Sequence, residues 1–142
     1  MPTDPFLRAA VREVISKFDV GYLYDHLRLQ NLAERENKIK STVEELEWFA
    51  KIYSKQHPTG PYFLGDDLSL VEIAILPFLE RFTILLKHYR NFELLPANNP
   101  KLARLSLALE TARKRPGWQE CAQSPEFFIR SYAGYGGKTD IE

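Results

Sequence analysis

Cys121 is the single cysteine of this 142-residue chain, and it is the first candidate for a nucleophile. A thiolate attacks well beside a base or at a helix N-terminus, because both lower the pKa of the thiol. Here no Cys-x-x-Cys pair occurs, and no histidine lies near the cysteine in the sequence. A lone cysteine among apolar residues is more often a small buried side chain. We therefore predict a structural Cys121 and assign no catalytic residue to this chain.

The histidines are the next candidates, because imidazole is a common zinc ligand. His26, His57 and His88 lie about thirty residues apart and form no i,i+4 pair on one helix face. A zinc site would depend on carboxylates that this spacing does not reveal. We predict histidines on the surface and no metal site.

Aromatic side chains offer a third kind of chemistry, the binding of an apolar ligand. Five of them fall on three predicted helices and could meet at one opening: Tyr22, Tyr24, Phe78, Phe128 and Tyr132. Aromatic residues at helical spacing also fill protein cores. Core packing and a binding wall are both open interpretations of the residues alone.

Helices must position these side chains, because apolar residues recur at steps of three and four and no stretch alternates with period two. Prolines and glycines separate the helical segments. The pattern predicts an all-α bundle of about five to six helices. They run from Thr3 to about Ala33, from about Glu36 to Gln56, onward from Ser69, from Asn99 to before Pro116, over a short turn from Trp118 to Ala122, and onward from Ser124.

The helix that follows Ser69 has the clearest start. Residues 69–72 form a capping box, in which the Ser69 hydroxyl accepts from a backbone N–H and the Glu72 carboxylate reaches back. The residues beyond it are apolar on nearly every face, which predicts a central, buried helix. Pro77 lies inside this helix and predicts a kink there. We assign Ser69 and Glu72 to folding alone.

Composition narrows the functional class. The chain is 44% hydrophobic and 27% charged, which is typical of a globular domain. Nineteen basic residues balance nineteen acidic ones, so the charge of a nucleic-acid binder is missing. The most apolar stretch, Leu68 to Leu79, is too short for a membrane span. A single cysteine suits a reducing compartment, so we expect a cytoplasmic protein with neither nucleic acid nor membrane as partner.

Residues 60–74, GPYFLGDDLSLVEIA, resemble the segment that enters the central helix in the C-terminal domain of cytosolic glutathione transferases. Residues 99–105 look like the next helix of that family, and RPGW at 115–118 looks like the turn after it. The likeness covers about Thr3 to Tyr132. Glu72 stands where the family usually has aspartate. LPFLERF at 76–82 is most similar to the omega, lambda and dehydroascorbate-reductase-like branches.

The resemblance implies a domain organisation. Residues 1–133 would form the helical domain and residues 134–142 a flexible tail. The related branches carry their reactive cysteine in an N-terminal thioredoxin-like domain, which we expect to be absent from this chain. An exposed apolar patch should then mark the place where that domain docks.

The resemblance also implies a function, that of the second-substrate-binding domain of a glutathione transferase or glutathione-dependent thiol transferase. Alone the chain would be nearly inactive and would hold no cofactor, while glutathione would be the co-substrate of the full-length enzyme. Its expected partners are the thioredoxin-like domain, missing or supplied in trans, and a second copy in a homo-oligomer. The expected substrate is a small hydrophobic molecule, a thiol or a disulfide.

The second-substrate pocket of the family implies candidate site residues here. The matching positions are Phe78, Arg81, Phe128 and Tyr132, followed by Phe18 and Tyr22. Arg81 could pair with an anionic group of the substrate or with a glutathione carboxylate. The alternative for Arg81 is a structural ion pair with Glu80 or another acid.

Two other functions stay open. The same fold resembles helical protein-interaction modules of elongation factor gamma subunits and some aminoacyl-tRNA synthetases, and net charge zero suits protein contacts there better than RNA contacts. A ligand-binding bundle without a partner domain is the third possibility.

Overall fold

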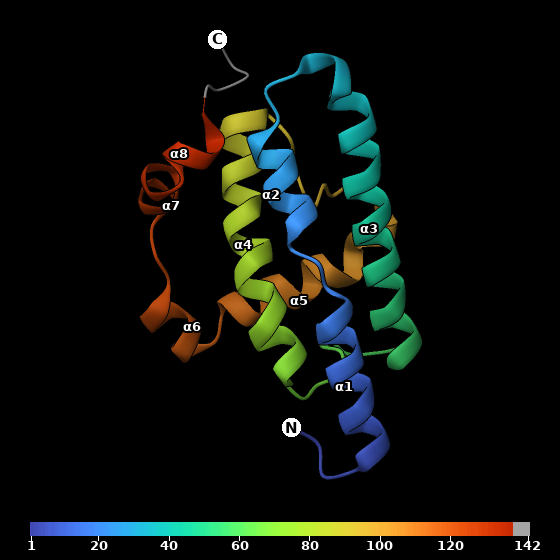
Figure 1. The fold of residues 1–142 in the computed structure, drawn as a ribbon. Helices are drawn as coiled ribbons and strands as arrows, with labels where there is room; N and C mark the ends of the chain where they lie inside the picture. Colours follow the sequence, from blue (N-terminus) through green and yellow to red (C-terminus); the bar gives the residue numbers. More distant parts are fainter. Residues whose placement is uncertain (138–142) are drawn as a thin grey trace.

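The computed structural model describes residues 1–137, and all of their regular structure is helical (Figure 1). The α-helices are α1 (Pro5–Lys17), α2 (Gly21–Arg28), α3 (Arg35–Gln56), α4 (Leu70–Arg90), α5 (Ala103–Arg113), α6 (Pro116–Cys121), α7 (Pro125–Ser131) and α8 (Ala133–Gly136). Two 3-10 turns, η1 (Leu32–Glu34) and η2 (Pro100–Leu102), precede α3 and α5. The loop before α4 holds two isolated β-bridges and no strand. The all-α prediction is confirmed.

The prediction of one long helix from Thr3 to about Ala33 is wrong. That segment divides into α1 and α2, because Phe18 takes an extended conformation that ends α1. The Asp19 side chain then accepts from the backbone N–H of Gly21 at 2.7 Å, and the chain turns before α2 begins. Asp4 caps α1, since its Oδ1 accepts from the N–H of Leu7 at 2.8 Å.

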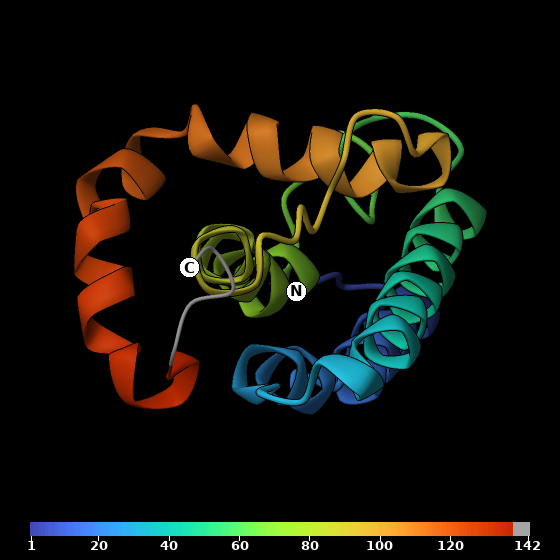
Figure 2. The same cartoon turned by 90° about the horizontal axis from the view of Figure 1, so that it is seen from above.

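Helix α4 begins at the predicted capping box. The backbone N–H of Val71 donates to Ser69 Oγ at 3.1 Å, and the N–H of Ser69 donates to Glu72 Oε2 at 2.8 Å. The helix continues through Pro77 without interruption. In Figures 1 and 2 its N-terminal part leans away from the axis of the rest, as expected for a proline inside a helix.

Helix α4 is the centre of the molecule. Figure 2 shows it nearly end-on, with α1 to α3 on one side, α5 across a second side and α6 to α8 along a third. It contacts α1, α2, α5 and α7. Its fully buried side chains form the middle of one core and include Ile75, Leu76, Leu79, Phe82 and Leu85. The prediction of a buried central helix is therefore confirmed.

The C-terminal segment differs from the expected flexible tail. Residues 134–136 belong to α8, and the buried Gly136 carbonyl accepts from Arg90 Nη2 at 2.5 Å and from Gln30 Nε2 at 3.1 Å. These bonds tie α8 to α4 and to the segment after α2, so residues 134–136 pack on the rest of the helices. Residues 138–142, the remainder of the expected tail, lie outside the described residues.

We call residues 116–137, which contain α6, α7 and α8, the C-terminal arm. The arm buries one residue, Gly136, and otherwise rests on the body through partly buried side chains. No helix between residues 1 and 137 combines the length and the hydrophobicity that crossing a membrane requires.

Candidate functional site

The guanidinium of Arg81 lies among three aromatic rings. Its carbon is 5.3 Å from the ring centre of Phe78, 5.7 Å from that of Phe128 and 5.5 Å from that of Tyr132. Such distances allow cation–π attraction from each ring. The structure thus brings together the four residues that the family resemblance placed first, and we call them the Arg81 cluster.

Two helices position this cluster. Phe78 and Arg81 are three residues apart on α4 and therefore share a face of that helix. Phe128 lies on α7, and Tyr132 follows its last residue. Helix α7 starts at a proline, and Ser124 Oγ accepts from the N–H of Phe127 at 3.2 Å, so a local cap fixes where the two rings are presented.

Tyr132 connects the cluster to the rest of the fold. Arg81 Nη1 donates to its hydroxyl at 2.8 Å, and the Tyr24 hydroxyl lies 3.3 Å from the same atom. Burial and the contact with Tyr24 raise the pKa of Tyr132, so it is a neutral phenol at physiological pH. Tyr24, another of the five aromatic residues named from the sequence pattern, therefore contacts the cluster through Tyr132.

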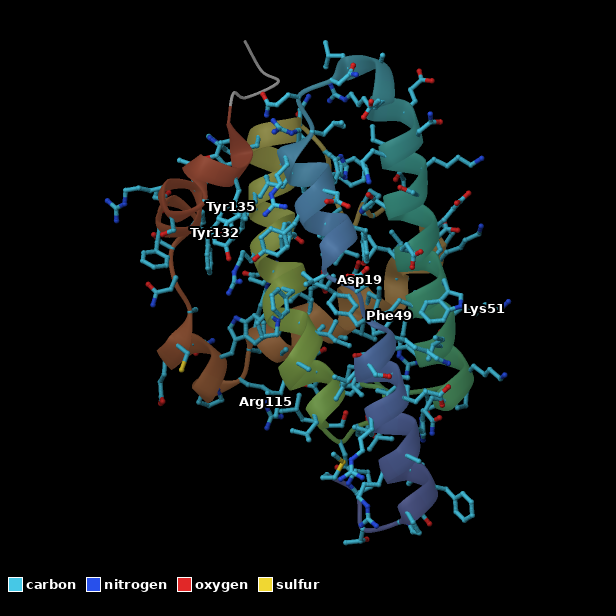
Figure 3. The ribbon with its side chains drawn as sticks, in the orientation of Figure 1. Asp19, Phe49, Lys51, Arg115, Tyr132 and Tyr135 are labelled. Atoms are coloured by element: carbon cyan, nitrogen blue, oxygen red, sulfur yellow. The ribbon has the colours of Figure 1, made fainter. Side chains whose placement is uncertain are left out.

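A cleft of about 520 Å³ opens beside the cluster, between α4, the end of α5, α6 and α7. This volume is in the range of small-molecule sites. Its walls are mostly apolar, and Arg81 and Phe128 take part in them. Figure 3 shows Arg115, another lining residue, toward the N-terminal end of α4 and Tyr132 farther along the same side of that helix. The other lining residues include Leu68, Ile73, Leu76, Pro77, Trp118 and Phe127.

The acids of the cleft have partners. Glu80 Oε2 accepts from Arg113 Nε at 2.9 Å and from Arg113 Nη2 at 2.5 Å. The suggested Glu80–Arg81 ion pair is therefore not the one that forms, because neighbouring residues on a helix point in different directions. Within residues 1–137 no carboxylate lies within salt-bridge distance of Arg81, and its buried Nε has no hydrogen-bond acceptor.

Glu72 also lines the cleft, but its carboxylate is occupied by the fold. Oε1 accepts from the Tyr53 hydroxyl and the Phe63 N–H, and Oε2 accepts from the N–H and hydroxyl of Ser69, each at 2.8 Å. The side chain is buried. These contacts support the assignment of Ser69 and Glu72 to folding.

Phe18 and Tyr22 lie elsewhere. Their rings are 6.5 Å apart, and Phe18 packs 5.3 Å from the ring of Phe49 on α3. Figure 3 shows Phe49 on the opposite side of α4 from Tyr132. Burial and the charges of Glu45 and Asp19 raise the pKa of Tyr22. The structure does not bring this pair to the Arg81 cluster.

Two predictions from the sequence are wrong. Cys121 is exposed and lines the cleft, because the short helix α6 stands off α4 and buries none of its side chains. His26 is not on the surface: it is buried, its Nδ1 lies 3.1 Å from Thr42 Oγ1, and its ring packs on Phe92. Across residues 1–137 no group of three potential metal ligands comes together.

Sequence reasoning missed the apolar walls of the cleft. Leu68 and Ile73 flank the capping box and are 36% and 58% exposed, and Trp118 belongs to the RPGW segment. Apolar residues that flank a cap normally pack on each other. The rule does not indicate that such residues can also line a cleft, as Leu68 and Ile73 do here.

Comparisons with known proteins agree with this geometry. The sequence profile described as "Glutathione S-transferase, C-terminal domain" matches residues 15–120. Glutathione S-transferase L1 of Arabidopsis thaliana is 45% identical over 78 residues, which are 55% of this chain and 31% of that protein. Glutathione S-transferase L3 of the same plant is 36% identical over 93 residues, 66% of this chain and 37% of that protein.

A third relative covers more of the chain. Protein IN2-1 homolog B of Oryza sativa subsp. indica is 28% identical over 127 residues, 89% of this chain and 42% of that protein. The chain thus spans less than half the length of these relatives, and the lambda-like branch suggested by residues 76–82 is consistent with them. With a profile match over most of its length and the predicted helical architecture around α4, the chain belongs to the family of glutathione S-transferase C-terminal domains.

Proposed function

We propose that this chain supplies the second-substrate wall of a glutathione-dependent thiol transferase of the lambda-like branch. The observation that carries the proposal is the Arg81 cluster beside the cleft. Phe128 offers apolar surface to the cleft. The Arg81 guanidinium, which lies among the rings of Phe78, Phe128 and Tyr132, offers charge-assisted hydrogen bonds to an anionic group of the substrate or of glutathione. Phe18 and Tyr22 would act only if another domain extended the pocket toward α3.

The reactive thiol would come from a thioredoxin-like domain, as the family resemblance implies. Glutathione would bind mainly to that domain. Cys121 faces the cleft but has neither a histidine nor a second cysteine beside it in the sequence, so it carries no part of the proposed chemistry. The chain alone would be nearly inactive.

The lip of the cleft supports docking of such a domain. Ile73 and Phe127 are large apolar side chains at 58% and 41% exposure, and both line the cleft. Exposed apolar surface in one place is typical of an interface. A thioredoxin-like domain over this lip would cover it and enclose the Arg81 cluster.

Self-association and location are further parts of the proposal. Phe6 on α1 is 85% exposed and Trp48 on α3 is also exposed, and these apolar side chains support a homo-oligomer. A single cysteine supports the cytoplasm. One relative, Glutathione S-transferase L2 of Arabidopsis thaliana, is named chloroplastic, so organelle fractionation is the appropriate test. No observation favours the alternative of a protein-interaction module.

Domain exchange tests the function. The thioredoxin-like domain of Arabidopsis Glutathione S-transferase L1 is fused to this chain, and glutathione-dependent reduction of 2-hydroxyethyl disulfide is measured. We expect the fusion to be active and each half alone to be much less active. The relative with its own C-terminal domain is the positive control. A fusion that folds but has no more activity than the thioredoxin-like domain alone contradicts the proposal.

A further inference from the structure

One buried arginine lies at the C-terminal ends of three helices. Arg90 is the last residue of α4, and its side chain is buried. Its Nη1 donates to the carbonyl of Tyr89 at 2.7 Å, and its Nη2 donates to the carbonyls of Leu27 and, at 2.5 Å, of Gly136. These carbonyls belong to the last turns of α4, α2 and α8, whose C-terminal ends gather at one end of the molecule (Figure 1).

The buried charge and the carbonyls stabilise each other. The last four carbonyls of an α-helix accept no bond within the helix, and this end of the helix carries negative partial charge. A guanidinium that is removed from water is stable only when its donors are hydrogen-bonded. One positive charge that is shared by three helix ends meets both requirements, and it joins the three ends to one another.

Close packing accompanies the bond to α8. A Cβ at residue 136 would lie 2.5 Å from the Tyr89 ring, so α8 approaches α4 this closely because the residue is glycine. Gln30 Nε2 donates to the same Gly136 carbonyl at 3.1 Å. We call Arg90, Gln30 and the carbonyls of Leu27, Tyr89 and Gly136 the Arg90 clamp.

The C-terminal arm depends on this clamp more than on burial. Within α6, α7 and α8 the buried residue is Gly136, which the clamp binds. Further attachments are the Tyr89 hydroxyl, which donates to the Ile129 carbonyl at 2.7 Å, and the bond from Arg81 to Tyr132. Segments with few buried contacts open locally before the whole protein unfolds. The arm is such a segment, and hydrogen bonds hold it closed.

Tyr132 lies one helical turn from the clamp. It follows the last residue of α7 and precedes α8, which ends at Gly136. The N–H of Gly136 donates to the Tyr132 carbonyl at 2.9 Å, so the backbone between them is one closed turn. Anchoring Gly136 therefore fixes where Tyr132 lies, and the Tyr132 hydroxyl is the acceptor that Arg81 Nη1 meets at 2.8 Å.

We propose that Arg90 is a positioning residue for the Arg81 cluster: by binding the C-terminal ends of α2, α4 and α8 it holds the C-terminal arm against α4 and sets the place of Tyr132 beside Arg81. The use of the cluster in a reaction rests on the proposed function, whereas the coupling between the clamp and Tyr132 is a property of the chain itself. Breaking the clamp opens the arm and leaves the core around α4 folded.

A double-mutant cycle tests this coupling. The equilibrium constant of unfolding is measured in urea for the 142-residue chain, Arg90→Gln, Tyr132→Phe and the double variant. We expect Tyr132→Phe to raise this constant about fivefold or more by itself, but less than about twofold after Arg90→Gln, because the Tyr132 hydroxyl then no longer lies at Arg81. Equal effects in both backgrounds overturn the proposal, since residues that act independently are additive.

A second cycle breaks the clamp while keeping the buried charge. Gly136→Ala pushes α8 away from Tyr89, and Gly134→Ala, where a Cβ would meet nothing within 4 Å, is the matched control in the same helix. Tyr132→Phe should raise the unfolding constant less than about twofold after Gly136→Ala and about fivefold or more after Gly134→Ala. The same effect in both backgrounds contradicts the proposal, even if Arg90→Gln does not fold.

NMR of 13C-labelled tyrosine at pH 7 separates positioning from a general loss of stability. The rings of Tyr24 and Tyr132 lie 6.2 Å apart, whereas Tyr53 is buried between α3 and the loop before α4. In Arg90→Gln and Gly136→Ala, the resonances of Tyr24 and Tyr132 should move toward their values in urea while that of Tyr53 stays. Resonances that all stay, or that all move together in both variants, overturn the proposal.

These measurements need neither glutathione nor a second domain, so their failure is distinct from failure of the proposed function. A coupled cycle together with an inactive domain fusion would retain the Arg90 clamp and reject the transferase. An additive cycle together with an active fusion would reject the clamp alone.

Discussion

Arg81 and Tyr132 join the central helix to the C-terminal arm, because Arg81 Nη1 donates to the Tyr132 hydroxyl at 2.8 Å across 51 positions of sequence. The same hydroxyl lies 3.3 Å from that of Tyr24 on α2. One phenol thus connects three parts of the fold at the edge of the cleft. Anything that moves the arm changes the surroundings of Arg81.

Removing this hydroxyl should loosen the arm. Tyr132→Phe loses a hydrogen bond to a charged donor, and we expect the free energy of unfolding to fall by about 1–2 kcal/mol. Urea unfolding measures the change. Tyr135→Phe is the control, because Tyr135 is exposed and packs on Tyr24 and Tyr132 through its ring. If both variants lower the free energy of unfolding equally, the Arg81–Tyr132 hydrogen bond does not hold the C-terminal arm to α4.

Position 136 should require glycine because the ring of Tyr89 leaves no room for a side chain there. A Cβ there would lie 2.5 Å from the ring of Tyr89, whereas a Cβ at Gly134 would meet nothing within 4 Å. Gly136→Ala should therefore destabilise the protein by about 1–3 kcal/mol, through overpacking. Gly134→Ala should be neutral or slightly stabilising, since alanine favours a helix. Thermal unfolding of the two variants makes the comparison, and a Gly136→Ala protein as stable as the unmodified chain would contradict it.

The Glu72 carboxylate should contribute more to the free energy of unfolding than its hydrogen bond in the capping box alone would. Ser69→Ala removes the hydroxyl that accepts from the Val71 N–H and donates to Glu72, and should cost about 1 kcal/mol. Glu72→Ala leaves the buried Tyr53 hydroxyl and the Phe63 N–H without an acceptor and should cost about 3 kcal/mol. Glu72→Asp, the residue usual in related proteins, should fall between them because its shorter side chain serves the cap better than it reaches Tyr53. Urea unfolding of the three variants tests this order of destabilisation. If Glu72 served only the cap, Glu72→Ala would cost no more than Ser69→Ala.

Local rules predicted the elements better than the site. The cap at Ser69 and the buried face of α4 follow from neighbouring residues, so the sequence pattern sufficed for them. The division at Phe18 depends on an Asp19 turn that competes with helix continuation, and apolar spacing does not report it. The exposure of Cys121 depends on where the arm stands relative to α4, which is decided by contacts such as Arg90 with Gly136. The Arg81 cluster was found only because a family resemblance pointed to its members.

Alkaline pH should destabilise the fold through two tyrosines, the buried Tyr53 and the partly buried Tyr22. Burial raises the pKa of Tyr53 and Tyr22, and nearby carboxylates act in the same direction: Glu72 on Tyr53, and Glu45 with Asp19 on Tyr22. The folded state then holds these protons where the unfolded state, with a tyrosine pKa near about 10, releases them. Their contribution is fully present below that pH and is lost as the pH rises above it.

Urea unfolding between pH 8 and 11 therefore should show a steady loss of stability above about pH 10. Tyr22→Phe removes one titrating group and leaves the Glu72 contacts intact. The free energy of unfolding should therefore fall less steeply with pH above about pH 10, while its value at pH 8 changes little. Absorbance at 295 nm in the folded protein should show Tyr22 and Tyr53 ionising only as the protein unfolds. Ionisation of all tyrosines near pH 10 in a protein that stays folded would contradict the burial of both hydroxyls.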